Sequence, residues 1–133
     1  SEYAIGVPQE MLDARLYPKI PVPGKNAFCF YPMSKRRNAD ENWFTLPFEE
    51  HHAHMQEHGV SGRKFGPRVT QLVTGSTGLD EYEWGVTLFA VHPDDLKEVV
   101  YTMRFDKASA IYAEFGQFYT GVLTPVEELV HTV

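Results

Sequence analysis

The stretch RVTQLVTGSTGLDEYEWGVTLFAV, residues 68–91, decides the fold. Its two ends, 68–75 and 82–91, are rich in β-branched and aromatic residues, which favour strands. The segment between them contains Gly78 and Asp80, residue types that are typical of turns. The stretch therefore predicts a β-hairpin in the middle of the chain.

One helix is predicted on each side of this hairpin. Before it, Thr45 can cap a helix whose first turn holds a proline and two acids, and Gly59 can end that helix directly after His58. After it, 93–104 begins with Pro-Asp-Asp and carries apolar residues at helical spacing. The predicted hairpin thus lies between two helices, with His58 at the C-terminus of the first one.

The outermost elements are two further strands, 27–32 and 116–123, both apolar and aromatic. The segment 106–115 is expected to be irregular or helical, and a short helical turn is expected at 9–15. The resulting order, β-α-β-β-α-β, predicts an α+β fold: a ferredoxin-like antiparallel sheet with both helices on one face.

The chain is expected to hold one folded domain. Residues 1–26 have little periodicity and four prolines, which is typical of an extended arm or linker. Residues 27–124 form the predicted ferredoxin-like domain, and residues 125–133 form a C-terminal tail. At 133 residues, a second independent core is not expected.

Two helices can cover only one face of the predicted sheet, and the strands carry more apolar side chains than that face can hide. These side chains are Phe28, Phe30, Leu72, Trp84, Val86, Leu88, Phe118 and Tyr119. We therefore expect a second sheet or a large apolar ligand to cover the opposite face. A partner chain or a missing half of the protein is the natural source of a second sheet.

Composition excludes several classes of function. The formal net charge of -6 argues against a nucleic-acid partner, which would require a basic surface. No stretch is apolar over the length of a bilayer span, and the single Cys29 cannot form an intrachain disulfide, so a cytoplasmic location is expected. The first residues lack both an initiator Met and a signal-peptide pattern, so a trimmed, processed or longer chain is expected.

Four of the six histidines fall in one predicted helix, at positions 51, 52, 54 and 58. His54 and His58 share a helix face, and His51 is near them. A zinc site is one interpretation, but the HExxH pattern is absent and no carboxylate or cysteine repeats at ligand spacing. A solvated helix face with one special histidine, His58, is the interpretation we favour.

A series of motifs carries a specific resemblance. In chain order they are 31–37 (YPMSKRR), 42–43 (NW), 58–59 (HG), 62–65 (GRKF), 78–80 (GLD), 83–89 (EWGVTLF), 101–106 (YTMRFD) and 109–116 (SAIYAEFG). The series resembles that of coproheme decarboxylases, which belong to the chlorite-dismutase-like family of haem proteins. The match runs from about residue 16 to residue 123 and is similar to only the second, haem-binding half of a typical subunit.

The resemblance implies a cofactor and two central residues. The cofactor is iron coproporphyrin III (coproheme), which is also the substrate, and haem b is the product. His58 is similar to the axial histidine that holds the iron, and neutral imidazole is an ordinary iron ligand. Tyr31 is similar to the tyrosine that becomes a radical after hydrogen peroxide oxidises the bound iron and then takes hydrogen from a propionate. From composition alone, Tyr31 would instead be an aromatic strand residue with a locally satisfied hydroxyl.

The resemblance also implies residues around the porphyrin edge, where four propionates need cations and hydroxyl donors. Lys35, Arg104 and Ser109 match positions that contact propionates or support the reactive one, and we assign Lys35 a catalytic role. Met33 lies close to the same edge, and Arg15 matches a further propionate-binding arginine. Each has a simpler interpretation as well: Lys35 in a solvated basic loop, and Arg104 and Ser109 as helix caps.

Two other functions compete with decarboxylation. Chlorite dismutases use a distal arginine at the position that Gln71 occupies here, and an amide cannot supply fixed positive charge, so Gln71 favours decarboxylation. The chain could also be a non-catalytic haem-binding or assembly module. The family pairs two ferredoxin-like halves in each subunit and forms rings, so the resemblance implies a separate N-terminal-half chain or a homo-oligomer such as a pentamer as the partner.

Overall fold

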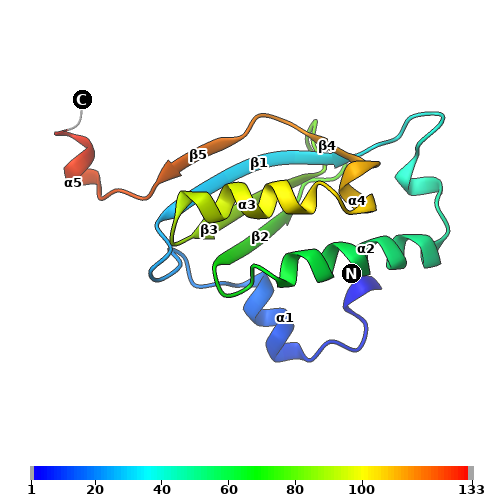
Figure 1. The fold of residues 1–133 in the computed structure, drawn as a ribbon, viewed down its shortest axis with the longest axis horizontal. Helices are drawn as coiled ribbons and strands as arrows, with labels where there is room; N and C mark the ends of the chain where they lie inside the picture. The colour runs from blue at the N-terminus through cyan, green and yellow to red at the C-terminus, as the bar shows by residue number, and fades with distance from the viewer. Residues whose placement is uncertain (1, 132–133) are drawn as a thin grey trace.

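The computed structural model describes residues 2–131, in which one antiparallel sheet carries its main helices on one face (Figure 1). The strands follow the order β2-β3-β1-β4, and β5 pairs with β1 on the same edge as β4. In chain order the elements are η1 Glu2–Ala4, α1 Gln9–Leu16, β1 Ala27–Lys35, η2 Trp43–Thr45, α2 Phe48–Arg63, β2 Val69–Gly75, β3 Trp84–Ala90, α3 Pro93–Met103, α4 Lys107–Ala110, β4 Ala113–Phe115, β5 Tyr119–Val122 and α5 Val126–Leu129. The predicted α+β ferredoxin-like fold is confirmed.

The central hairpin forms as predicted. Strands β2 and β3 pair from Val69↔Ala90 to Gly75↔Trp84. The turn between them uses Gly78 at φ 81°, a conformation that glycine adopts without a steric cost. The first predicted strand is also present, but β1 extends to Lys35 rather than ending at residue 32.

Helix α2 differs from the prediction at both ends. Thr45 does not cap it: this residue belongs to η2, and its hydroxyl donates to the carbonyl of Asn42. Pro47 precedes the first helical residue, and the helix continues through Gly59 to Arg63. His58 therefore lies inside the helix, not at its C-terminus as predicted. A glycine costs a helix only about 1 kcal/mol, which tertiary packing outweighs here.

The last predicted strand, 116–123, is split in two. Strand β4 pairs as Met33↔Phe115 and β5 pairs as Phe30↔Tyr119, so residues 31–32 of β1 face residues 116–118. Two residues opposite three make a β-bulge. Pro32 has no N–H to continue the ladder, while its carbonyl accepts a hydrogen bond from the Gly116 N–H at 2.9 Å. The segment 106–115 contains α4 and β4, so the prediction of an irregular or helical segment there is only half correct.

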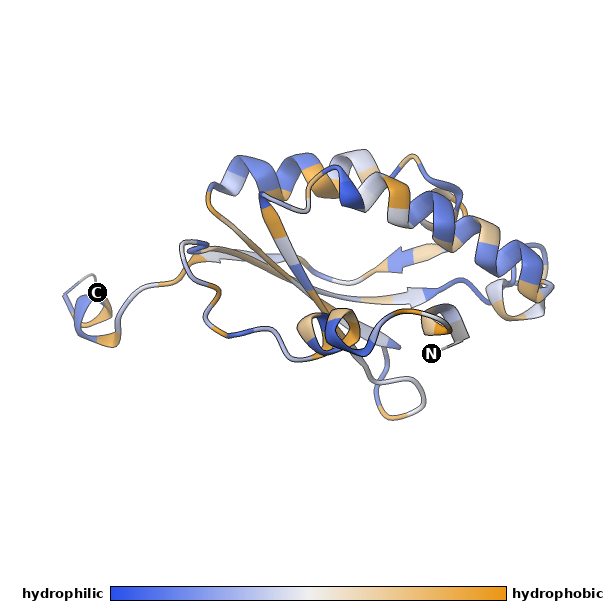
Figure 2. Ribbon diagram, turned by 90° about the horizontal axis from the view of Figure 1, so that it is seen from below, coloured by the Kyte–Doolittle hydropathy of each residue, from blue (hydrophilic) through white to orange (hydrophobic). Residues whose placement is uncertain are grey.

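The core lies between the sheet and the helices α2 and α3, which Figure 2 shows as a layer on one side of the strands. It consists of Ala27, Cys29, Phe65, Val69, Val86, Leu88, Ala90, Leu96 and Val99. Odd-numbered residues of β1 and even-numbered residues of β3 point to this side, because a strand alternates its side chains with period two.

This alternation corrects the predicted list of open-face residues. Val86 and Leu88 are buried in the core, and Phe118 packs against it. Trp84 pairs with Met33, so it also belongs to the helix side. The opposite face instead carries Phe28, Phe30, Leu72 and Tyr119, with Phe30 stacked on Tyr119 at a ring-centroid distance of 6.5 Å. This apolar face is smaller than predicted but still lacks a covering sheet in residues 2–131.

The N-terminal arm runs beside strand β2. Helix α1 forms where a helical turn was predicted, and Figure 2 places it on the other side of the sheet from α2 and α3. The Lys25 ammonium donates to the Thr70 hydroxyl at 2.8 Å, which fixes the end of the arm to the sheet. The predicted tail contains α5, which projects from the domain (Figure 1). Ser1 in the predicted arm and residues 132–133 in the predicted tail lie outside the described residues.

Candidate haem site

A small cavity of about 30 Å³ opens between the sheet and helices α2 and α3. Its lining residues come from seven elements and from the α3 cap: Tyr31, His58, Gln71, Leu88, Val99, Val100, Met103, Arg104, Ser109 and Phe115. The structure thus brings together five of the eight residues predicted for the site, namely Tyr31, His58, Gln71, Arg104 and Ser109. They are up to 78 positions apart in the sequence, between Tyr31 and Ser109.

His58 is oriented by a buried carboxylate. Its Nδ1 lies 2.9 Å from Asp106 Oδ2, and the Asp106 side chain is only 1% exposed. The Ser109 N–H donates to the other carboxylate oxygen at 2.9 Å, and the Ser109 hydroxyl lies 3.4 Å from the same histidine nitrogen. With Nδ1 as the donor to Asp106, the lone pair of Nε2 is left for another partner.

The pKa of Asp106 reflects this arrangement. Burial alone would raise the pKa of the Asp106 carboxyl. The hydrogen bonds from His58 and Ser109, together with the nearby His58 charge, lower this pKa by more than burial raises it. The net pKa lies below its ordinary value of 3.8, so Asp106 is a carboxylate at neutral pH. A charged acceptor strengthens the hydrogen bond to the imidazole and raises its basicity as a ligand.

Tyr31 is enclosed by aromatic rings. The Phe118 ring stacks on it at a centroid distance of 4.3 Å and an angle of 19°, and the Phe115 ring meets it edge-on at 5.6 Å. Burial raises the pKa of Tyr31 to about 12, Cys29 adds to the rise, and Arg104 opposes it. Tyr31 is therefore a neutral phenol with its proton at physiological pH.

Arg104 and Gln71 lie at the exposed side of the cavity. The Arg104 guanidinium sits 4.1 Å from the Phe115 ring centroid and 5.8 Å from that of Phe118. A guanidinium stacked on a ring still presents its N–H donors to a carboxylate. Gln71 is exposed on β2, and Val73 beside it is 48% exposed although it faces the helix side of the sheet. The helices therefore leave this face of the sheet open along its edge strand, β2.

Lys35 does not line the cavity. Its ammonium donates to the Ala108 carbonyl at 2.6 Å and lies 4.7 Å above the Trp43 ring. Burial lowers the pKa of Lys35 to about 8, with the charges of Asp106 and Glu83 opposing the fall. The residue is 9% exposed, so the solvated basic loop considered from sequence is wrong for Lys35. Its catalytic role stays a prediction.

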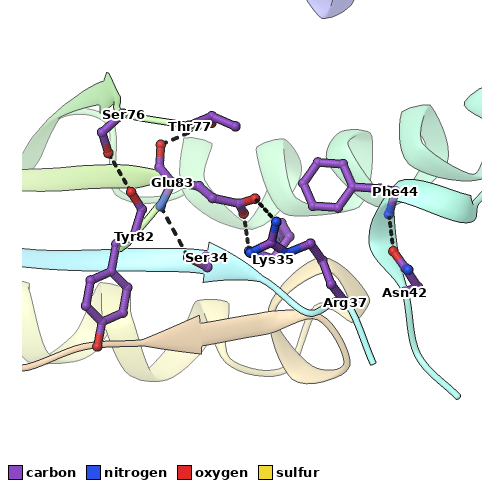
Figure 3. A network of polar contacts seen from close by, with 9 residues as sticks. All are labelled: Ser34, Lys35, Arg37, Asn42, Phe44, Ser76, Thr77, Tyr82 and Glu83. Carbon is purple, nitrogen blue, oxygen red and sulfur yellow. Dashed lines mark hydrogen bonds and ion pairs between the residues drawn. The ribbon is translucent and has the colours of Figure 1, made fainter. Parts of the chain in front are cut away.

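A buried glutamate fixes the end of β1 that carries Lys35. The Glu83 carboxylate accepts the Lys35 backbone N–H at 2.9 Å, and its other oxygen lies 4.0 Å from the Arg37 guanidinium. Figure 3 shows both contacts. The Glu83 N–H in turn donates to the Ser34 hydroxyl and to the Met33 carbonyl. The β2–β3 turn is thereby tied to the last three residues of β1.

The remaining predicted residues lie outside the cavity lining. Met33 packs against the core from β1, and Arg15 is exposed on α1. The other helix histidines do not gather around His58: the His51 ring stacks on Trp43 at 4.6 Å, and the His52 ring nitrogen meets the Gln56 amide. Within residues 2–131, no three His, Cys, Asp or Glu side chains lie close enough together to hold a metal ion.

Sequence reasoning missed three residues of this site. Asp106 has a sequence signal, because an aspartate before the short helix Lys107–Ala110 is a typical N-cap and its side chain does accept from Ser109. Phe118 had no such sequence signal, because residue types do not indicate the β-bulge that places Phe118 on the same sheet face as Tyr31. Glu83 belongs to one of the recognised motifs, yet nothing in its spacing indicates burial.

Comparisons with known proteins identify the family of this chain. A sequence profile described as Chlorite dismutase matches residues 1–124, so the chain belongs to the chlorite dismutase family. Within that family it is similar to the coproheme decarboxylase of Staphylococcus carnosus, with 50% identity over 116 residues. That match covers 87% of this chain and 46% of the relative.

Solved structures give the same picture. A heme-binding protein from Thermus thermophilus superposes with a TM-score of 0.79 at 46% identity, over 84% of this chain and 45% of that one. A chlorite dismutase variant from Candidatus Nitrospira defluvii gives a TM-score of 0.74 at 22% identity, over 98% of this chain and 53% of that one, which shows a shared fold. The chain thus spans about half the length of these relatives.

Proposed function

We propose that this chain is the haem-binding half of a coproheme decarboxylase, which converts coproheme to haem b with hydrogen peroxide. The observation that carries the proposal is that Tyr31 and His58 line one cavity, with His58 Nδ1 already engaged by Asp106. The 50% identity to the S. carnosus coproheme decarboxylase and the likeness to the T. thermophilus heme-binding protein support it.

The donor set fits an iron porphyrin. An imidazole whose Nδ1 donates to a carboxylate presents Nε2 as a ligand, which is the usual arrangement for metal-binding histidine. The cavity volume of about 30 Å³ has room for about one water molecule, so a porphyrin would need more space than this conformation offers. Gln71 and Val73 on β2, the edge strand beside the cavity, are exposed. Binding therefore requires side chains such as Met103 to move aside, since they fill this space between sheet and helix.

The chemistry of each step balances with one peroxide. One propionate, one hydrogen peroxide and one proton give a vinyl group, carbon dioxide and two waters. The bound iron supplies the oxidation, which is a property of the cofactor. In this proposal Tyr31 loses an electron and its phenolic proton together, then removes a hydrogen atom from the propionate side chain. Its raised pKa supports the starting state, because the proton is still on the phenol at neutral pH.

The cationic residues are proposed to hold propionates. Arg104 borders the cavity and offers a planar set of donors for a carboxylate. Ser109 contributes through its position beside His58, while Met33 and Arg15 are proposed to meet the porphyrin edge. Lys35 is proposed to support the reactive propionate, for which its ammonium would have to leave the Ala108 carbonyl.

The proposed partner is either a separate chain that supplies the N-terminal half or further copies of this chain in a ring such as a pentamer. The length relationship supports it, because this chain spans 46% of the S. carnosus relative. So does the apolar sheet face that contains Phe30 and Tyr119. The proposed location is the cytoplasm. None of the helices within residues 2–131 is long and apolar enough to cross a bilayer.

The test compares the wild-type protein with Tyr31→Phe after loading with coproheme and adding hydrogen peroxide. The absorption spectrum and chromatography of the extracted porphyrin follow the conversion through a singly decarboxylated intermediate to haem b. Tyr31→Phe should bind coproheme within roughly tenfold of wild type, because one hydroxyl contact is worth about 1 kcal/mol. It should give no product. Equal turnover by both proteins would reject the role of Tyr31, and binding without turnover by wild type would leave a non-catalytic haem-binding module.

A further inference from the structure

The β-bulge opposite Tyr31 and Pro32 changes which side chains reach the cavity side of the sheet. In a regular strand, residues 115 and 118 would point to opposite faces, because successive side chains alternate. The extra residue among 116–118 restores Phe118 to the face that Phe115 already occupies. Both rings consequently pack on Tyr31 from the same strand edge.

The two rings differ in what they touch. Phe115 lines the cavity, whereas Phe118 does not and contacts the site through Tyr31. Phe118 lies nearly parallel to the phenol at 4.3 Å, and the Phe115 ring lies 5.8 Å from it. The Arg104 guanidinium lies over both phenylalanine rings. Phe115 and Phe118 thus contact both Tyr31, the proposed radical residue, and Arg104, the proposed propionate-binding cation.

We propose that Phe118 is a positioning residue for the decarboxylation, which holds the Tyr31 ring in one orientation and, with Phe115, carries Arg104 beside it. This inference rests on the proposed function. A carboxylate bound by Arg104 would then lie beside the Tyr31 oxygen, because the side chains of Tyr31 and Arg104 are already held in the orientations that the reaction needs. Preorganisation of this kind affects the rate of the chemical step more than the binding of substrate.

The test uses Phe118→Leu, which keeps an apolar side chain but removes the ring, and Phe118→Tyr, which keeps the ring. Phe105→Leu is the matched control: Phe105 is 69% exposed, follows Arg104 in the chain and meets the Tyr101 ring edge-on at 5.2 Å. Circular dichroism and thermal unfolding first establish that all three variants are folded.

The first measurement needs no porphyrin. Tetranitromethane modifies accessible tyrosines, and peptide mass spectrometry gives the extent at Tyr31, with the 63% exposed Tyr101 as an internal reference. Nitration of Tyr31 should be slow in wild type and in Phe118→Tyr, and several-fold faster in Phe118→Leu. Equal nitration in wild type and Phe118→Leu would mean that Phe118 does not hold the phenol.

The second measurement is peroxide-dependent turnover of coproheme. Phe118→Leu should lower kcat by about tenfold or more with little change in KM, while Phe118→Tyr and Phe105→Leu should stay near wild type. An unchanged kcat in Phe118→Leu, with an active wild type, would overturn the positioning role alone. A wild-type protein that binds coproheme without converting it would overturn the proposed function, and the positioning role with it.

Discussion

The imidazole of His58 and the carboxylate of Asp106 are joined by a 2.9 Å contact that links α2 to the cap of α4. The aspartate has two roles, because its other oxygen accepts the Ser109 N–H and so starts the short helix. A change in its charge can therefore be separated from a change in its shape. Asparagine keeps the shape and remains a good N-cap.

Replacing Asp106 with Asn should weaken iron ligation while the domain stays folded. Without the negative charge, the imidazole is a poorer ligand and its ring orientation is less well defined, which typically costs roughly 10–100-fold in affinity at such sites. Titration of the protein with coproheme, followed by absorbance, gives the affinity. Asp80→Asn is the matched control, since Asp80 is an exposed turn residue whose carboxylate accepts the Glu81 N–H next to it in the chain. Equal affinities for Asp106→Asn and wild type would show that His58 is not the ligand or needs no carboxylate.

The positions of the helices and the hairpin could be predicted because they follow from local rules. Gly78 takes a positive-φ turn conformation that glycine adopts without a steric cost, and the Pro-Asp-Asp start of α3 satisfies the rules for a helix N-terminus. The end of α2 could not be predicted, because a glycine after His58 is a usual stop signal. The helix continues through Gly59 because α2 packs against α3 and α4, and this tertiary packing outweighs the cost of a glycine inside a helix.

The site was predictable as a list of residues but not as an arrangement. Motif resemblance named Tyr31, His58 and Arg104, which do line one cavity. It gave no indication that Lys35 turns away to the Ala108 carbonyl, because that depends on how β1 and α4 pack. The bulge escaped prediction for a similar reason, since it arises from pairing between segments more than 80 residues apart, as in Phe30↔Tyr119.

Gly116→Ala should destabilise the protein. An added Cβ would lie 2.7 Å from Pro32 Cγ and 2.8 Å from Tyr82 Cζ, and a proline ring within a strand cannot rotate away. Overpacking of this kind typically costs about 1–3 kcal/mol. Gly121→Ala on β5 is the matched control, because a Cβ there meets nothing within 4 Å. Urea unfolding of both variants provides the comparison. An equal midpoint for the two would show that the contact between Gly116 and Pro32 can accommodate a methyl group.

The protein should not be a monomer in solution. Phe28, Phe30 and Leu72 share a sheet face that no sheet or large helix of residues 2–131 covers. A stable partner should bury more than about 1,000 Å² of surface there. Light scattering during size exclusion gives the mass of the assembly, and denaturing mass spectrometry then distinguishes copies of this chain from a second chain. Phe30→Glu should dissociate it, whereas Phe105→Leu on the helix side should not. A stable wild-type monomer would contradict this prediction.

Lys35 should make the stability of the protein rise with pH in the alkaline range. Its pKa is about 8 in the folded protein, against an ordinary value of 10.5, because burial disfavours the charged amine. Below about pH 8 both the folded and the unfolded chain hold the proton, so the full cost of the buried charge is present. Between about pH 8 and 10.5 only the unfolded chain holds it, and the free energy of unfolding increases as pH rises. The shift corresponds to about 3 kcal/mol as an upper bound.

The measurement is urea unfolding of wild type and Lys35→Met across this pH range. Subtracting the two curves of unfolding free energy against pH cancels the titration of Tyr31, which both proteins contain. That difference should be flat below about pH 8 and then change in favour of wild type. A flat difference up to pH 10.5 would mean that Lys35 keeps its ordinary pKa and is not buried as a charge beside Trp43.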